Sequence, residues 1–226
     1  MTSLELYSYA ACPFAQRTRM VLAEKDLDFN LYEIDVYEKP KGWEKISPYG
    51  KVPLLRHDGG TIYESTIINE YIDERFPDPP LMPASAIDRA TARIWIDYCE
   101  NRFLPALHGL VRLKDEPDKL AKQIDTVRET LEYIEFEGLR KLSEGPYWFG
   151  QNPTLVDFQY LPFFERFGVY RVLVGFQWPD RCTRLVSWLD TMSARDSVQP
   201  TLRPLEYHLE QQRRLAERLA ARRSAG

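Results

Sequence analysis

The chain has 226 residues and a formal net charge of −4, and its residues are 44% hydrophobic and 13% aromatic. This composition excludes overall disorder. The small acidic excess excludes a general nucleic-acid or anionic-membrane binder, which needs surplus lysine and arginine. No apolar run approaches the ~20 residues that cross a bilayer, and three widely spaced cysteines form no disulfide framework. We therefore expect a cytoplasmic protein without a signal peptide and without membrane contact.

The first predicted elements form a strand–helix–strand unit. Residues 4–9 show the partial alternation of a short strand, residues 13–24 follow helical spacing, and residues 29–36 suggest a second strand. A helix between two strands favours a parallel strand pair with a right-handed crossover.

A hairpin and a helix complete this unit. Residues 52–56 and 61–63 are predicted strands, and Asp58-Gly59-Gly60 between them supplies the positive-φ positions of a tight turn. Ser65 is the predicted N-cap of the helix that follows. The order βαβ and then ββα predicts an α/β domain over residues 1–76.

The pattern changes after this domain. Residues 77–85, PDPPLMPAS, hold four prolines in nine positions, which neither a helix nor a central strand tolerates, so we interpret them as a linker. Residues 86–226 show helical spacing and no convincing alternation, which predicts an all-helical domain. Thr154-Leu155-Val156-Asp157 has the form of an N-capping motif. Pro105 and Pro162 lie inside helical patterns and should kink or divide them.

Cys12 falls where the first strand gives way to the first helix. Pro13 takes the first helical position, where its missing N–H costs nothing, so Cys12 lies at or beside the N-cap. The free N–H groups and the positive end of the helix favour a thiolate there, and Arg17 and Arg19 add positive charge nearby. This arrangement predicts that the pKa of the Cys12 thiol lies below the ~8.5 of a free cysteine.

The other cysteines point to an external thiol as the partner of Cys12. Cys99 and Cys182 are assigned to packing. Position 15, where a second cysteine would complete a C-x-x-C motif, is Ala15. A disulfide formed at Cys12 must therefore be resolved by a small thiol from outside the chain.

Three linked motifs carry a family resemblance: CPFAQR at 12–17, PYGKVPLL at 48–55 and YES at 63–65. Together with the domain order they resemble the cytosolic glutathione transferases, and the cysteine is similar to that of the omega-like, lambda-like and dehydroascorbate-reductase-like classes. The resemblance covers residues 4–202. It implies a thioredoxin-like α/β domain that binds glutathione, then an all-α acceptor-binding domain, in a homodimer.

The resemblance also implies a set of glutathione-binding residues, namely Phe14, Lys39, Lys51, Val52, Pro53, Glu64 and Ser65. A cis Val52–Pro53 bond would turn the Val52 backbone toward the cysteinyl amide of glutathione. Glu64 and Ser65, at a helix N-terminus that suits a carboxylate, would hold the γ-glutamyl end. The two lysines could meet the glycyl carboxylate. The alternative for each lysine is a solvated side chain, and Ser65 could be only a helix cap.

The function that these residues favour is glutathione-dependent thiol transfer of the omega-like type, with the Cys12 thiolate attacking a disulfide, a glutathionyl adduct or an oxidised small acceptor. One alternative is glutathione conjugation or β-etherase-like thioether cleavage, in which bound glutathione is the nucleophile and the acceptor is a small electrophile. Another is a non-catalytic regulatory module. Ser8 and Tyr9 remain weaker candidates for activating a thiol near the first strand.

Two remaining features carry no predicted chemistry. His57, His108 and His208 are scattered without metal-ligand spacing, so we expect no metal site. The arginine-rich tail from residue 205 is interrupted by glutamates and has only a thin apolar stripe, which predicts a solvated or frayed helix.

Overall fold

The computed structural model describes residues 3–224 and begins with a four-stranded sheet. The strands are β1 (Leu4–Ser8), β2 (Phe29–Glu33), β3 (Leu54–His57) and β4 (Gly60–Tyr63), in the order β2-β1-β3-β4. β1 pairs parallel with β2 and antiparallel with β3, and β3 pairs antiparallel with β4. The predicted βαβ and ββα units are confirmed as the two halves of a thioredoxin-like domain.

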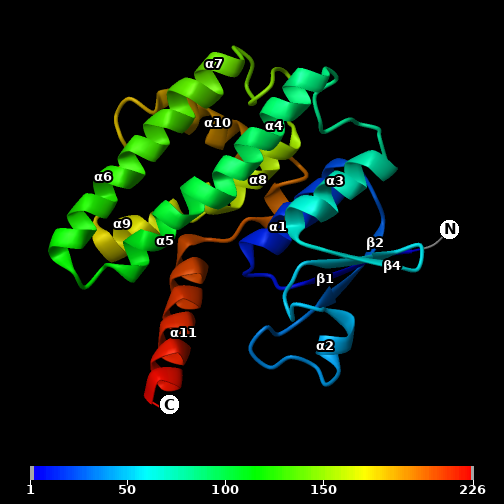
Figure 1. Ribbon diagram of the computed structural model, residues 1–226, viewed down its shortest axis with the longest axis horizontal. Coiled ribbons are helices and arrows are strands. Elements are labelled where there is room, and N and C mark those ends of the chain that lie inside the picture. Colours follow the sequence, from blue (N-terminus) through cyan, green and yellow to red (C-terminus); the bar gives the residue numbers. More distant parts are fainter. Residues whose placement is uncertain (1–2, 225–226) are drawn as a thin grey trace.

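Three helices complete this domain: α1 (Pro13–Glu24), α2 (Trp43–Ile46) and α3 (Ser65–Arg75). In β1 the alternate residues Leu4, Leu6 and Ser8 are buried, as the period of two requires. α1 and α3 pack against each other and against α8 of the helical domain, so they lie between the sheet and that domain (Figure 1).

Ser65 is not the N-cap of its helix, so that prediction is wrong. α3 begins at Ser65 itself, and the N-cap position belongs to Glu64, whose φ of 68° is in the left-handed region. The Ser65 side chain is buried and its Oγ accepts a hydrogen bond from Arg17 at 3.3 Å. The turn out of β4 therefore ends one residue earlier than a cap at Ser65 would place it.

The second domain is helical, as predicted. Its elements are α4 (Ala86–Tyr98), α5 (Leu104–Arg112), α6 (Pro117–Tyr133), α7 (Arg140–Leu142), α8 (Leu155–Glu165), α9 (Phe167–Val174), α10 (Thr183–Ser193) and α11 (Leu205–Ser224). Two π-helical segments, η1 (Cys99–Phe103) and η2 (Ile134–Leu139), join α4 to α5 and α6 to α7, and η3 (Gln199–Thr201) is a short 3-10 turn. None of the helices in the described part of the chain combines the length and apolarity that crossing a membrane requires.

The two helical prolines behave differently. Pro105 is the second residue of α5, directly after the π-helical segment that separates α4 from α5, so the predicted division is confirmed. Pro162 lies inside α8, which continues to Glu165 without a break.

α8 is the central helix of the second domain, with ten of its eleven residues buried. The predicted N-capping motif is confirmed, because the Asp157 carboxylate accepts hydrogen bonds from the Thr154 N–H at 2.7 Å and the Thr154 hydroxyl at 2.9 Å. It also accepts the Trp188 indole N–H at 2.7 Å. This capping fixes the first residue of α8. Its last residue, Glu165, lies at the interface with α1, where it contacts Gln16.

Candidate functional site

Cys12 occupies the N-cap of α1, as the sequence predicts. Its backbone N–H donates to the Tyr9 carbonyl at 2.9 Å, and its Sγ lies 3.8 Å from the carbonyl oxygen of Val52. The backbone N–H groups of Phe14 and Ala15 point at the sulfur. The structure thus brings the predicted nucleophile against the backbone that the resemblance assigns to glutathione.

The pKa of the Cys12 thiol is raised, not lowered, so the predicted direction is wrong. Burial raises this pKa, while the N–H groups of Phe14 and Ala15 and the charges of Arg19 and Arg166 lower it by less. The residue keeps some solvent exposure, yet its thiol is strongly desolvated by the surrounding protein. Sequence reasoning counted the helix terminus and missed this desolvation.

The Val52–Pro53 bond is cis, as the resemblance implies. Pro53 is buried directly before β3, and Val52 is half-buried. Both lysines lie near this loop. The Nζ of Lys39 lies 3.4 Å from the position that a Cβ atom on Gly50 would occupy. The Nζ of Lys51 lies 5.9 Å from the centroid of the Tyr49 ring. Their glutathione-binding roles, like those of Glu64 and Ser65, stay predictions.

Arg17 is fully buried, so it is neither solvated nor a free positive charge beside Cys12. Its Nε donates to the Gln159 carbonyl at 2.9 Å, and its Nη1 donates to Glu100 at 2.5 Å and to Ser65. The guanidinium lies 4.7 Å from the centroid of the Phe163 ring. Arg17 therefore joins the N-terminus of α3 to the helical domain, and Glu100 neutralises its charge.

Phe14 also faces the helical domain through its side chain. Its ring centroid is 5.6 Å from that of Phe163 in an edge-to-face arrangement, and 5.0 Å from the guanidinium carbon of Arg17. Its backbone N–H, not its ring, is directed at Cys12. A glutathione contact through Phe14 therefore remains a prediction for the backbone.

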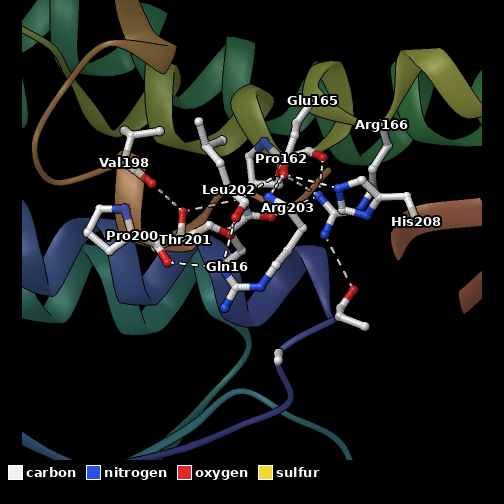
Figure 2. A network of polar contacts seen from close by, with 12 residues as sticks. Gln16, Pro162, Glu165, Arg166, Val198, Pro200, Thr201, Leu202, Arg203 and His208 are labelled. Carbon is white, nitrogen blue, oxygen red and sulfur yellow. Dashed lines mark hydrogen bonds and ion pairs between the residues drawn. The ribbon is translucent and has the colours of Figure 1, made fainter. Parts of the chain in front are cut away.

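A buried polar network that the sequence analysis missed surrounds Glu165 at the end of α8 (Figure 2). Its carboxylate receives Gln16 Nε2 at 2.6 Å, the Arg203 N–H at 2.8 Å, His208 Nε2 at 3.0 Å and Arg166 Nη1 at 3.1 Å. Burial opposes ionisation, but the hydrogen bond from His208, the charge of Arg166 and the other donors outweigh it and lower the pKa of Glu165.

Arg166 connects this network to the segment that carries Cys12. Its Nη1 donates to Gln16 Oε1 at 2.8 Å, and its Nη2 reaches the carbonyl oxygen of Ala11 at 3.4 Å. The available sequence signal was the charged pair Glu165–Arg166 at the end of an otherwise apolar helix. Its partners lie about 150 residues away in α1, so the pattern alone could not identify them.

A cavity of about 670 Å³ opens between the domains beside Cys12. Ala11 and Pro13, which flank the cysteine, line it together with Tyr9 and Tyr37 of the first domain, and most of the remaining wall comes from α5, α8, α9 and α11. This volume suits a small organic ligand. The cavity is therefore the candidate acceptor site.

The tail forms the continuous helix α11 and lines this cavity, so it is not frayed, whereas its side chains from 213 to 221 are exposed, as the solvated prediction requires. Figure 1 shows α11 projecting from the helical domain along the side of the sheet domain. The Tyr9 hydroxyl donates to Gln211 Oε1 at 3.0 Å, and the Arg218 guanidinium lies 4.0 Å from the centroid of the Tyr37 ring. These contacts tie the tail to the first domain.

The part of the chain that the structure describes contains no group of three or more histidine, cysteine, aspartate or glutamate side chains that could hold a metal ion.

Comparison with known proteins gives two family matches. Residues 6–80 match the glutathione S-transferase N-terminal domain, and residues 102–191 match the glutathione S-transferase C-terminal domain.

Three similar proteins span most of the chain. Glutathione S-transferase U24 of Arabidopsis thaliana is 30% identical over 199 residues, which is 87% of this chain and 88% of the relative. Rice GST1, solved in complex with glutathione, is 31% identical with a TM-score of 0.85 and coverage of 95% and 98%. Glutathione transferase Omega 3C of Trametes versicolor is 28% identical with a TM-score of 0.85 and coverage of 97% and 92%.

Proposed function

This chain belongs to the glutathione transferase family, and from that premise we propose that it is a glutathione-dependent thiol transferase of the omega-like type. The observation that carries the proposal is the position of Cys12. Its sulfur lies at a helix N-terminus, faces the Val52 carbonyl at 3.8 Å and borders a cavity sized for an organic acceptor. A cysteine there can form a disulfide, which distinguishes it from a group that only donates a hydrogen bond.

Glutathione would bind in the first domain. Its cysteinyl amide would pair with the backbone of Val52, which brings its sulfur beside Cys12. Its γ-glutamyl carboxylate would meet Ser65 and the N-terminal N–H groups of α3, with Glu64 at its ammonium. The glycyl carboxylate would lie near Lys39 and Lys51. The rice relative, solved with glutathione, supports this assignment through its fold.

The proposed reaction has two displacements. The Cys12 thiolate attacks the glutathionyl sulfur of a mixed disulfide, so a Cys12–glutathione disulfide forms, and the acceptor thiolate leaves and takes up a proton. The thiolate of a second glutathione then attacks that sulfur, which releases oxidised glutathione and restores Cys12. Ala15 cannot replace the second glutathione, because it has no thiol.

One observation favours a second candidate function. Because burial raises the pKa of Cys12, its protonated form is the more abundant one near neutral pH. A Cys12 S–H could donate a hydrogen bond to the thiolate of bound glutathione, which would then be the nucleophile in conjugation or thioether cleavage.

Replacing Cys12 by serine separates the two candidates. Cys12→Ser should lose glutathione-dependent reduction of a mixed disulfide, because a hydroxyl forms no disulfide, yet it should remain bound by immobilised glutathione. The matched control is Cys182→Ser in the helical domain, which should keep full activity. If Cys12→Ser keeps its mixed-disulfide turnover, bound glutathione is the nucleophile and the second candidate replaces the first.

We also propose a cytoplasmic homodimer built from domains 1–76 and 86–226 with the linker 77–85. Exposed apolar side chains on α3 and α4 support an assembly, since Ile67, Ile94 and Ile87 are 55%, 65% and 73% exposed. In this dimer each first domain faces the partner's helical domain about a two-fold axis. Sedimentation that finds only monomer at micromolar concentration would remove the dimer.

A further inference from the structure

The cavity beside Cys12 combines an apolar wall with an excess of positive charge. The apolar wall contains Val111, Phe163, Val169, Tyr170, Leu215 and Leu219. The charged lining residues are Arg112, Lys114 and Arg166, opposed by the carboxylate of Asp115. An uncharged apolar acceptor would use the wall but make no use of this positive charge.

Arg166 is the cation of the cavity lining whose charge acts on the Cys12 sulfur. Its side chain is only 14% exposed and lies against Ala11, the residue before Cys12. Hydrogen bonds to Gln16 Oε1 and Glu165 Oε2 use its Nη1, and the Ala11 carbonyl uses one hydrogen of Nη2. Among residues 3–224, Nε and the second Nη2 hydrogen have no partner. These two donors form the edge of a guanidinium that binds a carboxylate in a bidentate manner.

The surrounding charges leave the cavity positive. Glu165 pairs with Arg166 through Nη1 at 3.1 Å from outside the cavity, and this pairing leaves the Nε–Nη2 edge of the guanidinium free. Lys114 is paired with Asp115 at 2.6 Å. Arg112, at the C-terminal end of α5, has no hydrogen-bond or ion-pair partner within the described residues.

We propose that this cavity selects acceptors that join an apolar body to an anionic group, a carboxylate or a sulfonate, and that the anionic group binds the Nε–Nη2 edge of Arg166. The apolar body packs on α9 and α11, and Arg112 adds long-range attraction from the rim. The assignment of this site to the acceptor rests on the proposed function, whereas its anion selectivity does not require any reaction.

The physical reason for selection is the cost of leaving the guanidinium donors unmatched. Gln16, Glu165 and Ala11 hold Arg166 in place, so an arriving carboxylate finds its partner already oriented. A neutral amide of the same shape can accept a hydrogen bond only through its single carbonyl oxygen, and it brings no opposite charge. A charged hydrogen-bonded pair of this kind separates the two ligands by roughly tenfold or more in affinity.

Calorimetric titration of the full-length protein with 2-naphthoate and with 2-naphthamide tests the proposal. These probes share one apolar body and differ in charge. We expect the wild type to bind naphthoate roughly tenfold more tightly than naphthamide. Arg166→Gln should remove most of this preference while naphthamide affinity stays unchanged, which also shows that the cavity is intact. The control Arg213→Gln removes a cation from α11 outside the cavity and should keep the preference.

Arg112→Gln gives a second test that does not disturb the buried network. It should lower the naphthoate preference about two- to threefold and weaken its dependence on salt. Equal binding of the two probes by the wild type would overturn the proposal, whether or not Arg166→Gln folds. A preference that Arg166→Gln and Arg112→Gln both leave unchanged would also overturn it.

The same titration in Cys12→Ser separates this inference from the proposed function. Anion selectivity should persist there, because the serine leaves Arg166 and the wall in place. If Cys12→Ser keeps mixed-disulfide turnover while naphthoate is still preferred, the thiol-transfer function fails and the anion site stands. If turnover depends on Cys12 but the probes bind equally, the anion site fails alone.

Discussion

The two sides of the cleft at Cys12 are built in different ways. The first-domain side consists mainly of backbone groups, with the Val52 carbonyl 3.8 Å from the sulfur and the N-terminus of α3 beside it. The cavity side consists of side chains from α5, α8, α9 and α11, with Arg166 held by partners in α1 and α8. A backbone-built surface suits one constant peptide-like ligand, whereas a side-chain surface can be altered by single substitutions. The difference suggests that glutathione recognition and acceptor choice can be changed separately.

The largest expected effect is on the side-chain network. Glu165→Gln removes the charge that faces Arg166 and His208 in a buried site, and breaking such a pair lowers the free energy of unfolding by about 3 kcal/mol. Chemical denaturation of both proteins at pH 7 measures this. The control Glu210→Gln loses only exposed pairs, with Arg213 and Arg214, and should change stability by less than about 0.5 kcal/mol. If Glu165→Gln and Glu210→Gln have the same free energy of unfolding, the Glu165 network does not stabilise the cavity side.

The stability difference should also depend on pH in a defined direction. The pKa of Glu165 is lowered from its ordinary 4.5, so its contribution is fully present above that value and is lost as the pH falls through the lower folded pKa. The gap between wild type and Glu165→Gln should therefore close in acid. A gap that stays constant down to pH 3 would show that the variant acts through packing instead of charge.

The cavity wall offers a second, smaller effect. Leu215 and Leu219 on α11 are 41% and 47% exposed, so a ligand that covers them gains roughly 1 kcal/mol from each. Replacing both by asparagine should weaken 2-naphthoate and 2-naphthamide alike by up to about 30-fold, since the wall makes no distinction of charge. Retention on immobilised glutathione should not change. A matching loss of glutathione binding would show that the two sides are coupled.

The pKa of Cys12 measures the balance between desolvation, which raises it, and the helix N-terminus, which lowers it. Because burial raises its pKa above the ordinary 9.0, the rate of iodoacetamide alkylation should climb with pH and reach its midpoint above that value. The measurement uses a background of Cys99→Ala and Cys182→Ala, whose thiols have pKa values raised by burial to about 12. Arg166→Gln should move the midpoint further up, since it removes a charge that lowers this pKa. A midpoint below 9.0 would show that the helix terminus dominates.

The smallest effects belong to the two lysines of the first domain. Both are exposed, so loss of a solvent-screened contact with the glycyl carboxylate should weaken glutathione binding about two- to fivefold in Lys51→Ala or Lys39→Ala. Calorimetry with glutathione measures this, and Lys45→Ala in α2 is the matched exposed control. If both variants bind glutathione as tightly as Lys45→Ala does, the two lysines are solvated side chains that do not contact glutathione.

The first-domain side could be predicted from the sequence because its residues are close together along the chain. Cys12 at a helix N-cap, the cis Val52–Pro53 bond and the hairpin before Ser65 each follow from a few neighbouring residues or from a motif. The N-cap of α3 was predicted at Ser65 instead of Glu64 because the N-cap residue has a left-handed φ, which glutamate rarely adopts.

The cavity side could not be predicted in the same way, because its residues meet only after the domains pack. Arg17 reads as a surface cation but is fully buried beside Glu100, 83 positions away. The burial that raises the pKa of Cys12 likewise depends on tertiary packing, which no local pattern encodes. The role of the tail as a cavity wall was missed because its thin apolar stripe, which includes Leu215 and Leu219, lines a cavity instead of a core.

The central claim is that Cys12 becomes covalently linked to glutathione during turnover. Intact-protein mass spectrometry after treatment with a small excess of oxidised glutathione tests it most directly. We predict one added glutathione per chain, located on the peptide that contains Cys12, absent in Cys12→Ser and removed by reduced glutathione. Unmodified protein, or an adduct confined to Cys99 or Cys182, would contradict a thiol transferase that works through Cys12.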